Sequence, residues 1–101
     1  MYLYFFNAHL NMFYVYIIES MLDGRYYTGQ TEKISERLDR HNKGKNISTK
    51  PYRPWKLKWW KEFDTRSEAF RTEQQIKALK KRERLEKFVV ENNFRGVAQP
   101  G

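Results

Sequence analysis

The sequence predicts an α+β fold in which helices pack on a three-stranded antiparallel sheet. Two stretches rich in Tyr, Val and Ile flank Asp23 and Gly24, as the strands of a β-hairpin flank their turn. A later stretch, residues 55–63, alternates well enough between apolar and polar residues to predict a third strand beside the hairpin. Most other apolar residues recur at helical spacing, which predicts helices that cover the sheet.

The predicted hairpin reads FYVYIIESMLDGRYYTGQT. A two-residue turn at Asp23-Gly24 pairs residues whose numbers sum to 47, for example Tyr16 with Thr31. Because side chains alternate along a strand, Tyr16 and Tyr27 then project from the same face. Two phenols beside a glycine that permits close approach predict a binding surface. The alternative is that these tyrosines only pack and form hydrogen bonds.

The residues after the hairpin predict a short amphipathic helix over 32–42, because Ile34 and Leu38 are four apart and a glycine follows as a stop. Arg37 and His41 lie on the border of that apolar stripe. A guanidinium held at the edge of the core is a fixed donor for a phosphate. The alternative for His41 is a helix-end histidine that interacts with the helix dipole.

Residues 43–54, KGKNISTKPYRP, have the composition of a loop. The loop is long for so small a domain, and such loops tend to be mobile or to bind a ligand. A loop that is merely solvated is the alternative. The basic residues of this loop and of the start of the third strand are predicted to contact nucleic-acid phosphates: Lys43, Lys45, Lys50, Arg53, Lys56 and Lys58.

The third strand is expected to have one buried side. Simple alternation places Trp55, Leu57, Trp59 and Phe63 on one face and Lys56, Lys58, Trp60 and Glu62 on the other.

Thr65 and Glu68 have capping-box spacing and predict a helix that runs to about Lys80. The residues of its inward stripe are Ala69, Phe70, Ile76 and, at the edge, Leu79. Glu73 lies in the middle of that stripe, where a carboxylate needs a cation or a metal ion as partner. An ion pair with Lys77 or with an arginine of another element is the alternative to a metal site.

Residues 80–92 predict a second helix or a continuation, with Leu85, Phe88 and Val89 as its buried seam. Residues 1–11 lack the basic start of a secretory signal and predict a peripheral leader, either an added strand or a poorly ordered tail. Residues 93–101 have no core pattern and predict a frayed tail. One domain over 12–92 is therefore expected.

Charge and cysteine content restrict the function. The 101 residues contain no cysteine, which excludes disulfides and thiolate metal sites and agrees with a cytoplasmic protein. Twenty Lys and Arg against twelve Asp and Glu give a formal net charge of +8. With 17% aromatic residues and no long apolar run, this balance predicts a polyanionic partner, nucleic acid rather than membrane.

The four residues singled out above on independent grounds, Tyr16, Tyr27, Arg37 and Glu73, occur in an order that resembles the GIY-YIG nuclease family. The matching segments are Tyr14-Val15-Tyr16, Tyr27-Thr28-Gly29, Arg37 in ISERLDRHN, His41 one turn later, and Glu73 in EAFRTEQQIK. The words HNKG and RP also resemble small standalone bacterial members, which are similar to the amino-terminal nuclease domain of the excinuclease of DNA excision repair. The sequence departs from the family in having Tyr14 for a glycine and Thr28 for an isoleucine. Only Asn92 or Asn93 is a candidate for the family's late asparagine.

The resemblance implies an endonuclease that hydrolyses phosphodiester bonds in DNA, with structured or damaged DNA in repair or recombination as the expected setting and RNA not excluded. It implies that Glu73 binds one Mg²⁺ or Mn²⁺ ion and that Arg37 neutralises charge on the phosphate. Tyr16 is then the general base, which Tyr27 and His41 assist.

Two other functions stay open at the level of the sequence. One is a catalytically silent nucleic-acid-binding module of the same fold, and the other is a protein-interaction module that uses the exposed side of the third strand. The natural substrate, a protein partner for targeting and the oligomeric state do not follow from the sequence.

Overall fold

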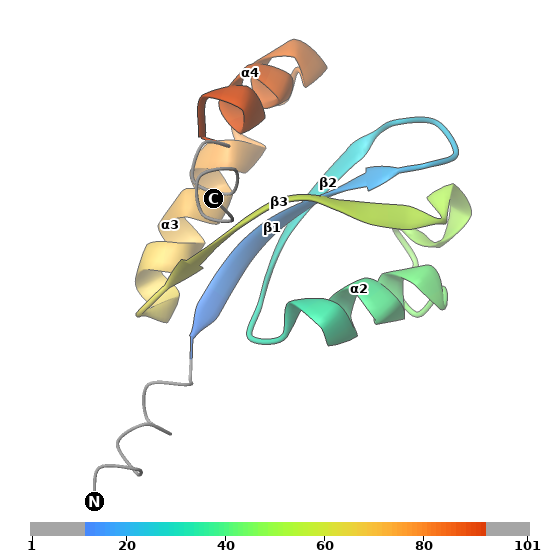
Figure 1. Ribbon diagram of the computed structural model, residues 1–101, viewed down its shortest axis with the longest axis horizontal. Helices are drawn as coiled ribbons and strands as arrows, with labels where there is room; N and C mark the ends of the chain where they lie inside the picture. The colour runs from blue at the N-terminus through green and yellow to red at the C-terminus, as the bar shows by residue number, and fades with distance from the viewer. Residues whose placement is uncertain (1–11, 93–101) are drawn as a thin grey trace, which may run out of the picture.

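The computed structural model describes residues 12–92, which form a three-stranded antiparallel sheet with helices on both faces (Figure 1). The strands are β1 (Phe13–Ser20), β2 (Tyr26–Thr31) and β3 (Trp55–Phe63), in the order β2-β1-β3. The helices are α2 (Ile34–Asn42), α3 (Arg66–Lys77) and α4 (Arg82–Asn92), with a short 3₁₀ helix η1 (Lys50–Tyr52) before β3. The predicted α+β class is confirmed, whereas the predicted leader (1–11) and tail (93–101) lie outside the described residues.

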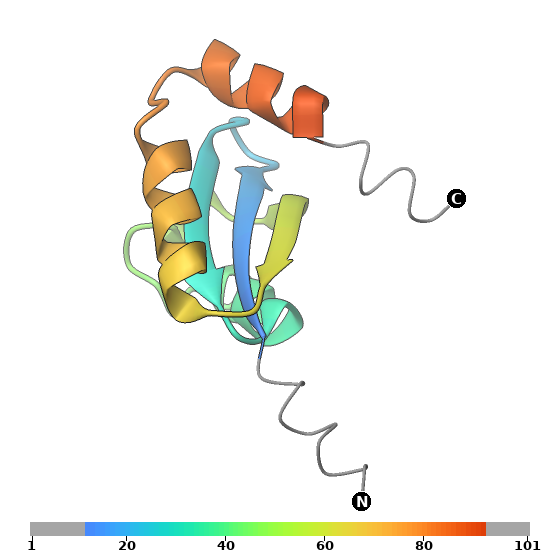
Figure 2. The ribbon, with the colours of Figure 1, turned by 90° about the vertical axis from the view of Figure 1, so that its left-hand side faces the viewer.

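The central strand β1 supplies both halves of the core. Val15 and Ile17 pack with residues of α3 and α4, whereas Tyr16 and Ile18 pack with residues of α2 and the start of β3. Figures 1 and 2 show α2 on one face of the sheet and α3 on the other. Because neighbouring side chains of a strand point to opposite faces, a strand covered on both sides is apolar at consecutive positions, as β1 is.

The hairpin register differs from the predicted one by two residues. Tyr16 pairs with Gly29 and Ile18 with Tyr27, so that paired numbers sum to 45. The loop is longer than predicted because the Ser20 hydroxyl accepts hydrogen bonds from the backbone N–H groups of Leu22 and Asp23, at 3.0 and 3.1 Å. A slip of two residues preserves the faces, and Tyr16 and Tyr27 still share one.

The prediction that β3 has one buried side is wrong. Ile17 pairs with Trp59 but Ile18 pairs with Leu57, which leaves Lys58 as the extra residue of a β-bulge. The bulge reverses the alternation within the strand. Trp55 and Leu57 therefore pack on the α2 side, whereas Trp59 and Phe63 pack on the α3 side.

Helix α3 begins as predicted but ends earlier. The Thr65 side chain accepts a hydrogen bond from the Glu68 N–H at 3.2 Å, so the predicted cap is present. The helix ends at Lys77, three residues before the predicted end. Phe70 was expected in the inward stripe but is 53% exposed, because the small, fully buried Ala69 brings the helix close to the sheet and leaves its neighbour outside.

Helix α4 packs as the sequence predicted. Val89 is buried in the core, and Leu85 and Phe88 pack against the same cluster. None of the helices within residues 12–92 has the length and apolar character needed to span a membrane.

Candidate active site

The ring of Tyr16 lies against the backbone of the neighbouring strand at Gly29. A Cβ atom placed on Gly29 would lie 2.4 Å from the Tyr16 hydroxyl oxygen and 2.6 Å from the carbon that carries it. No side chain fits at those distances, so the absence of a Cβ at Gly29 is what allows the phenol to occupy this position. The glycine thus sets the place of the tyrosine hydroxyl.

Gly29→Ala is expected to destabilise the domain and displace the phenol. The forced movement should lower the free energy of unfolding by about 1–3 kcal/mol, as overpacking of a core does. Urea denaturation measures this loss, and the fluorescence or NMR shift of Tyr16 reports its displacement. Unchanged stability together with an unmoved phenol would contradict the close approach.

A buried chain of hydrogen bonds runs from Tyr16 through His41 to Thr49. The Tyr16 hydroxyl lies 2.9 Å from Nε2 of His41, and Nδ1 of His41 lies 2.8 Å from the Thr49 hydroxyl. Thr49 donates its own proton to the Asn46 carbonyl at 3.4 Å, so it accepts the proton on Nδ1. Nε2 is then the unprotonated nitrogen, and it accepts the hydrogen bond from Tyr16.

Burial sets the protonation states of this pair. It raises the pKa of Tyr16 to about 12, against the opposing effect of a hydrogen bond and positive charge from Arg37. Burial also lowers the pKa of His41, and the positive charges of Arg37 and Arg40 lower it further. At neutral pH the phenol is therefore protonated and the imidazole is neutral.

The stability of the domain is expected to fall below about pH 6.5, the ordinary pKa of histidine. The unfolded chain binds a proton on His41 at a higher pH than the folded chain does. The stability that the neutral imidazole contributes is therefore complete above the unfolded pKa and is lost as the pH falls through the lowered folded pKa. Urea denaturation between pH 7.5 and 5 measures this, and in His41→Gln the dependence should flatten. An imidazole NMR titration at or above pH 6.5 for His41 would contradict it.

Arg37 and Glu73 meet at the outer edge of strand β2. The Arg37 guanidinium donates to the Gln30 carbonyl at 3.4 Å, and Nε2 of Gln30 donates to Oε1 of Glu73 at 3.2 Å. Because Gln30 follows Gly29, its side chain points to the α3 face rather than the α2 face. Glu73 also forms the ion pair with Lys77 that the sequence left open, at 2.8 Å, and its side chain is 12% exposed.

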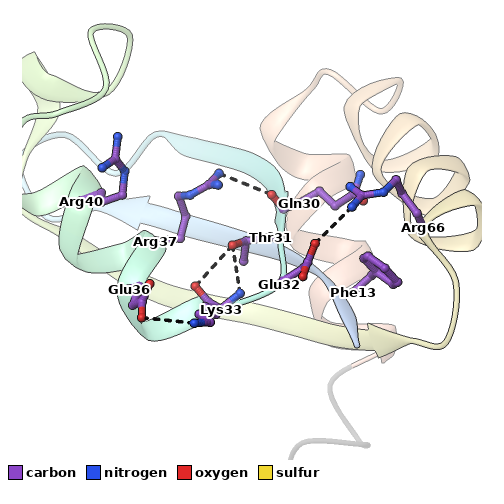
Figure 3. Close-up of a pocket in the computed structure, with 9 residues that line it drawn as sticks. All are labelled: Phe13, Gln30, Thr31, Glu32, Lys33, Glu36, Arg37, Arg40 and Arg66. Atoms are coloured by element: carbon purple, nitrogen blue, oxygen red, sulfur yellow. Dashed lines mark hydrogen bonds and ion pairs between the residues drawn. The ribbon is translucent and has the colours of Figure 1, made fainter. Parts of the chain in front are cut away.

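A cavity of about 410 Å³ opens at this edge (Figure 3). Gln30 and the arginines Arg37, Arg40 and Arg66 line it, together with Phe13, Thr31, Glu32, Lys33 and Glu36. Figure 3 shows Arg66 paired with Glu32, at 3.1 Å, while the Arg37 side chain reaches toward Gln30. The arginines make the cavity suitable for an anion such as phosphate.

The buried oxygens beside the cavity suit a hard cation. Oε1 of Gln30 is buried without a hydrogen-bond partner among the described residues, and the Glu73 carboxylate lies next to the same amide. Within residues 12–92 no three His, Cys, Asp or Glu side chains gather into a metal-binding group. Oxygen donors in small number fit Mg²⁺ or Mn²⁺, which keep several water ligands, rather than zinc.

Comparison with known proteins agrees with this arrangement. Residues 12–87 match the family model of the GIY-YIG catalytic domain. The chain belongs to the GIY-YIG family. This family places the chain among nuclease-type domains, whose members typically use a divalent metal ion.

Relatives of this GIY-YIG domain include UPF0213 proteins. One from Staphylococcus saprophyticus is 38% identical over 71% of this chain and 88% of its own length. One from Halobacterium salinarum is 42% identical over 67% of this chain and 88% of its own length. The solution NMR structure of a UPF0213 protein from Bacillus halodurans has a TM-score of 0.54 and 34% identity, and the match covers 80% of this chain and 85% of that chain.

The remaining tyrosine of the GIY-YIG motif lies beside the histidine. The ring of Tyr27 is edge-on to His41, with centroids 5.1 Å apart. The structure therefore brings Tyr16, Tyr27 and His41 together on the α2 face, and Arg37 and Glu73 meet them at the β2 edge. Their catalytic roles remain predictions.

The six predicted phosphate-binding residues do not form one surface. Lys50 and Arg53 line a cavity of about 480 Å³ with Asn42, Pro51 and Pro54, at the end of α2 that carries His41. Lys43 pairs with Asp39 at 2.9 Å in the last turn of α2, and Lys45 follows in the same exposed loop. Lys56 and Lys58 instead both lie 3.7 Å from Glu19, which also pairs with Arg82 of α4 on the face opposite Tyr16.

Sequence reasoning missed the side chains that hold the site together. Oδ1 of Asn42 accepts from the backbone N–H of Trp55 at 2.6 Å, and Nδ2 donates back to the carbonyl of Trp55 at 3.0 Å. The Trp55 indole donates to the Thr49 carbonyl at 2.9 Å. The asparagine after His41 in the HNKG word was the only available signal for this anchor, and nothing in the sequence marked Thr49 or Gln30.

The late asparagine of the family has no counterpart at the site among the described residues. Nδ2 of Asn92 donates to the carbonyl of Phe88 in its own helix, at 2.8 Å. Asn93 lies outside the described residues.

Proposed function

We propose that this GIY-YIG domain is a divalent-metal-dependent endonuclease that hydrolyses phosphodiester bonds in DNA. The observation that carries the proposal is the junction at Gly29-Gln30. Gly29 seats the Tyr16 hydroxyl against His41, and Gln30 contacts both Arg37 and Glu73. A proton acceptor, a cationic phosphate ligand and a metal-binding carboxylate thus come from four elements to one strand.

The Glu73 carboxylate and the free carboxamide oxygen of Gln30 are the groups that would hold one Mg²⁺ or Mn²⁺ ion. When bound, such an ion polarises the scissile phosphate and stabilises the leaving oxygen. Arg37, which lines the adjacent cavity, binds a nonbridging oxygen of the phosphate and offsets the charge that develops there.

Tyr16 and His41 move the proton of the attacking water as a pair. A phenol with a pKa of about 12 is not a phenolate at neutral pH. As the water oxygen forms its bond to phosphorus, the water proton passes to the Tyr16 oxygen while the Tyr16 proton passes to Nε2 of His41, 2.9 Å away. The bond to the leaving oxygen breaks, and solvent protonates that oxygen.

A cleavage assay tests the proposal directly. The chain is incubated with duplex, single-stranded, flapped and branched DNA and with matching RNA, in Mg²⁺, in Mn²⁺ and in EDTA. Cleavage of a DNA substrate in either metal and none in EDTA is expected. Structured or damaged DNA in repair or recombination is the proposed setting, and the lack of cysteine suits a reducing cytoplasm.

The Glu73–Lys77 ion pair favours a second candidate function. If Lys77 permanently occupies the carboxylate, the domain is a catalytically silent nucleic-acid-binding module that uses its net charge of +8. Salt-dependent DNA binding without cleavage of any substrate in either metal would support this candidate and overturn the nuclease.

A further inference from the structure

One of the three tryptophans is left in contact with water on the face that carries the candidate site. Trp60 is 48% exposed, whereas Trp55 and Trp59 are 3% and 5% exposed. Trp60 pairs with Tyr16 in the β1–β3 ladder, so the two side chains project from the same face of the sheet. A large aromatic side chain beside a candidate site is a natural contact for a ligand.

Trp60 forms one wall of a second cavity, of about 420 Å³. The ring of Tyr14 lies edge-on to the indole, with centroids 6.1 Å apart, and also lines the cavity. Leu57 and the first turn of α2, where Ile34 lies, form the rest of the wall. We call this the Tyr14–Trp60 cavity. Its size falls in the range of sites for small organic groups.

The Tyr14–Trp60 cavity adjoins the arginine-lined cavity. Glu32, Lys33 and Glu36 line both of them. The two carboxylates on this shared wall are paired, Glu36 with Lys33 at 3.8 Å and Glu32 with Arg66 at 3.1 Å. A polyanionic strand that crosses the wall therefore does not meet uncompensated negative charge.

We propose that the Tyr14–Trp60 cavity binds one unpaired nucleobase of the strand whose phosphate reaches Arg37. This inference rests on the proposed function for the position of that phosphate. An indole stacks on any base because every base has a π-face, and bases inside a duplex are already stacked. The substrate class is therefore single-stranded, flapped or branched nucleic acid in preference to intact duplex.

Tryptophan fluorescence in EDTA tests the proposal without cleavage. Because Trp55 and Trp59 are buried, quenching by a short single-stranded oligonucleotide reports on Trp60. Trp60→Ala should weaken single-strand binding by roughly 5-fold to 100-fold and leave duplex binding unchanged. Trp60→Phe should retain most of the affinity. Phe70→Ala, which removes an aromatic residue that is 53% exposed on α3, is the matched control and should change neither affinity.

Three results would overturn the base-binding site. They are unchanged single-strand affinity in folded Trp60→Ala, single-strand binding that leaves Trp60 unquenched, and coverage of Trp60 by another occupant. The last is detected when deletion of residues 1–11 increases acrylamide quenching of Trp60, or when Trp60→Ala abolishes a dimer or binding to a purified protein, with oligonucleotide affinity unchanged. Cleavage by the wild type without any effect of Trp60 keeps the nuclease and removes only this site. Quenching of Trp60 by oligonucleotide without cleavage does the reverse.

Discussion

Replacement of Glu73 by Gln is expected to reduce metal-dependent cleavage by about 10³-fold, or about 4 kcal/mol of transition-state stabilisation, while the domain stays folded. The substitution keeps the shape of the side chain and its hydrogen bond to Gln30 but removes the negative charge that binds the cation. Single-turnover rates on the best DNA substrate measure the loss. Titration calorimetry with Mn²⁺ should show weakened metal binding in the same variant.

Lys77→Gln is the matched control for this prediction. It removes the partner that lies 2.8 Å from the Glu73 carboxylate and leaves the carboxylate itself. Mn²⁺ binding should tighten and the cleavage rate should be equal or higher, because the cation no longer competes with an ammonium group. Wild-type cleavage by Glu73→Gln, with EDTA controls blank, would show that the proposed metal site is wrong.

Tyr16→Phe is expected to slow cleavage by about 10²–10⁴-fold, the usual contribution of a positioned proton-transfer group. The substitution deletes only the hydroxyl that contacts His41. The buried imidazole loses its partner, which should also cost about 1–3 kcal/mol of unfolding free energy. Single-turnover rates and urea denaturation separate the two effects when the assay is run where both proteins are fully folded.

Tyr26→Phe provides the comparison for Tyr16→Phe. Tyr26 is the neighbour of Tyr27 in β2, but it packs against the core on the α3 side. Removal of its hydroxyl should leave the cleavage rate within about twofold of the wild type, since it lies away from the proton-transfer pair. Equal rates for Tyr16→Phe and wild type would assign the general base to another group.

Local patterns predicted the secondary structure well because alternation and helical spacing are properties of the chain itself. The cap at Thr65, the buried seam of α4 and the common face of Tyr16 and Tyr27 all follow from such spacing. The common face survives the wrong hairpin register because the error is an even number of residues. The face of Trp55 and Leu57 did not survive, since one extra residue at the bulge reverses it.

The sequence by itself determined the order of the strands and helices and the chemical types of the site residues: phenol, guanidinium, imidazole and carboxylate. Only the tertiary structure decided that His41 is fully buried between Tyr16 and Thr49, and that Gln30 joins Arg37 to Glu73. These contacts join residues up to 43 positions apart. Their distances depend on how closely α2 and α3 pack on the sheet, and side-chain volumes across several elements set that packing together.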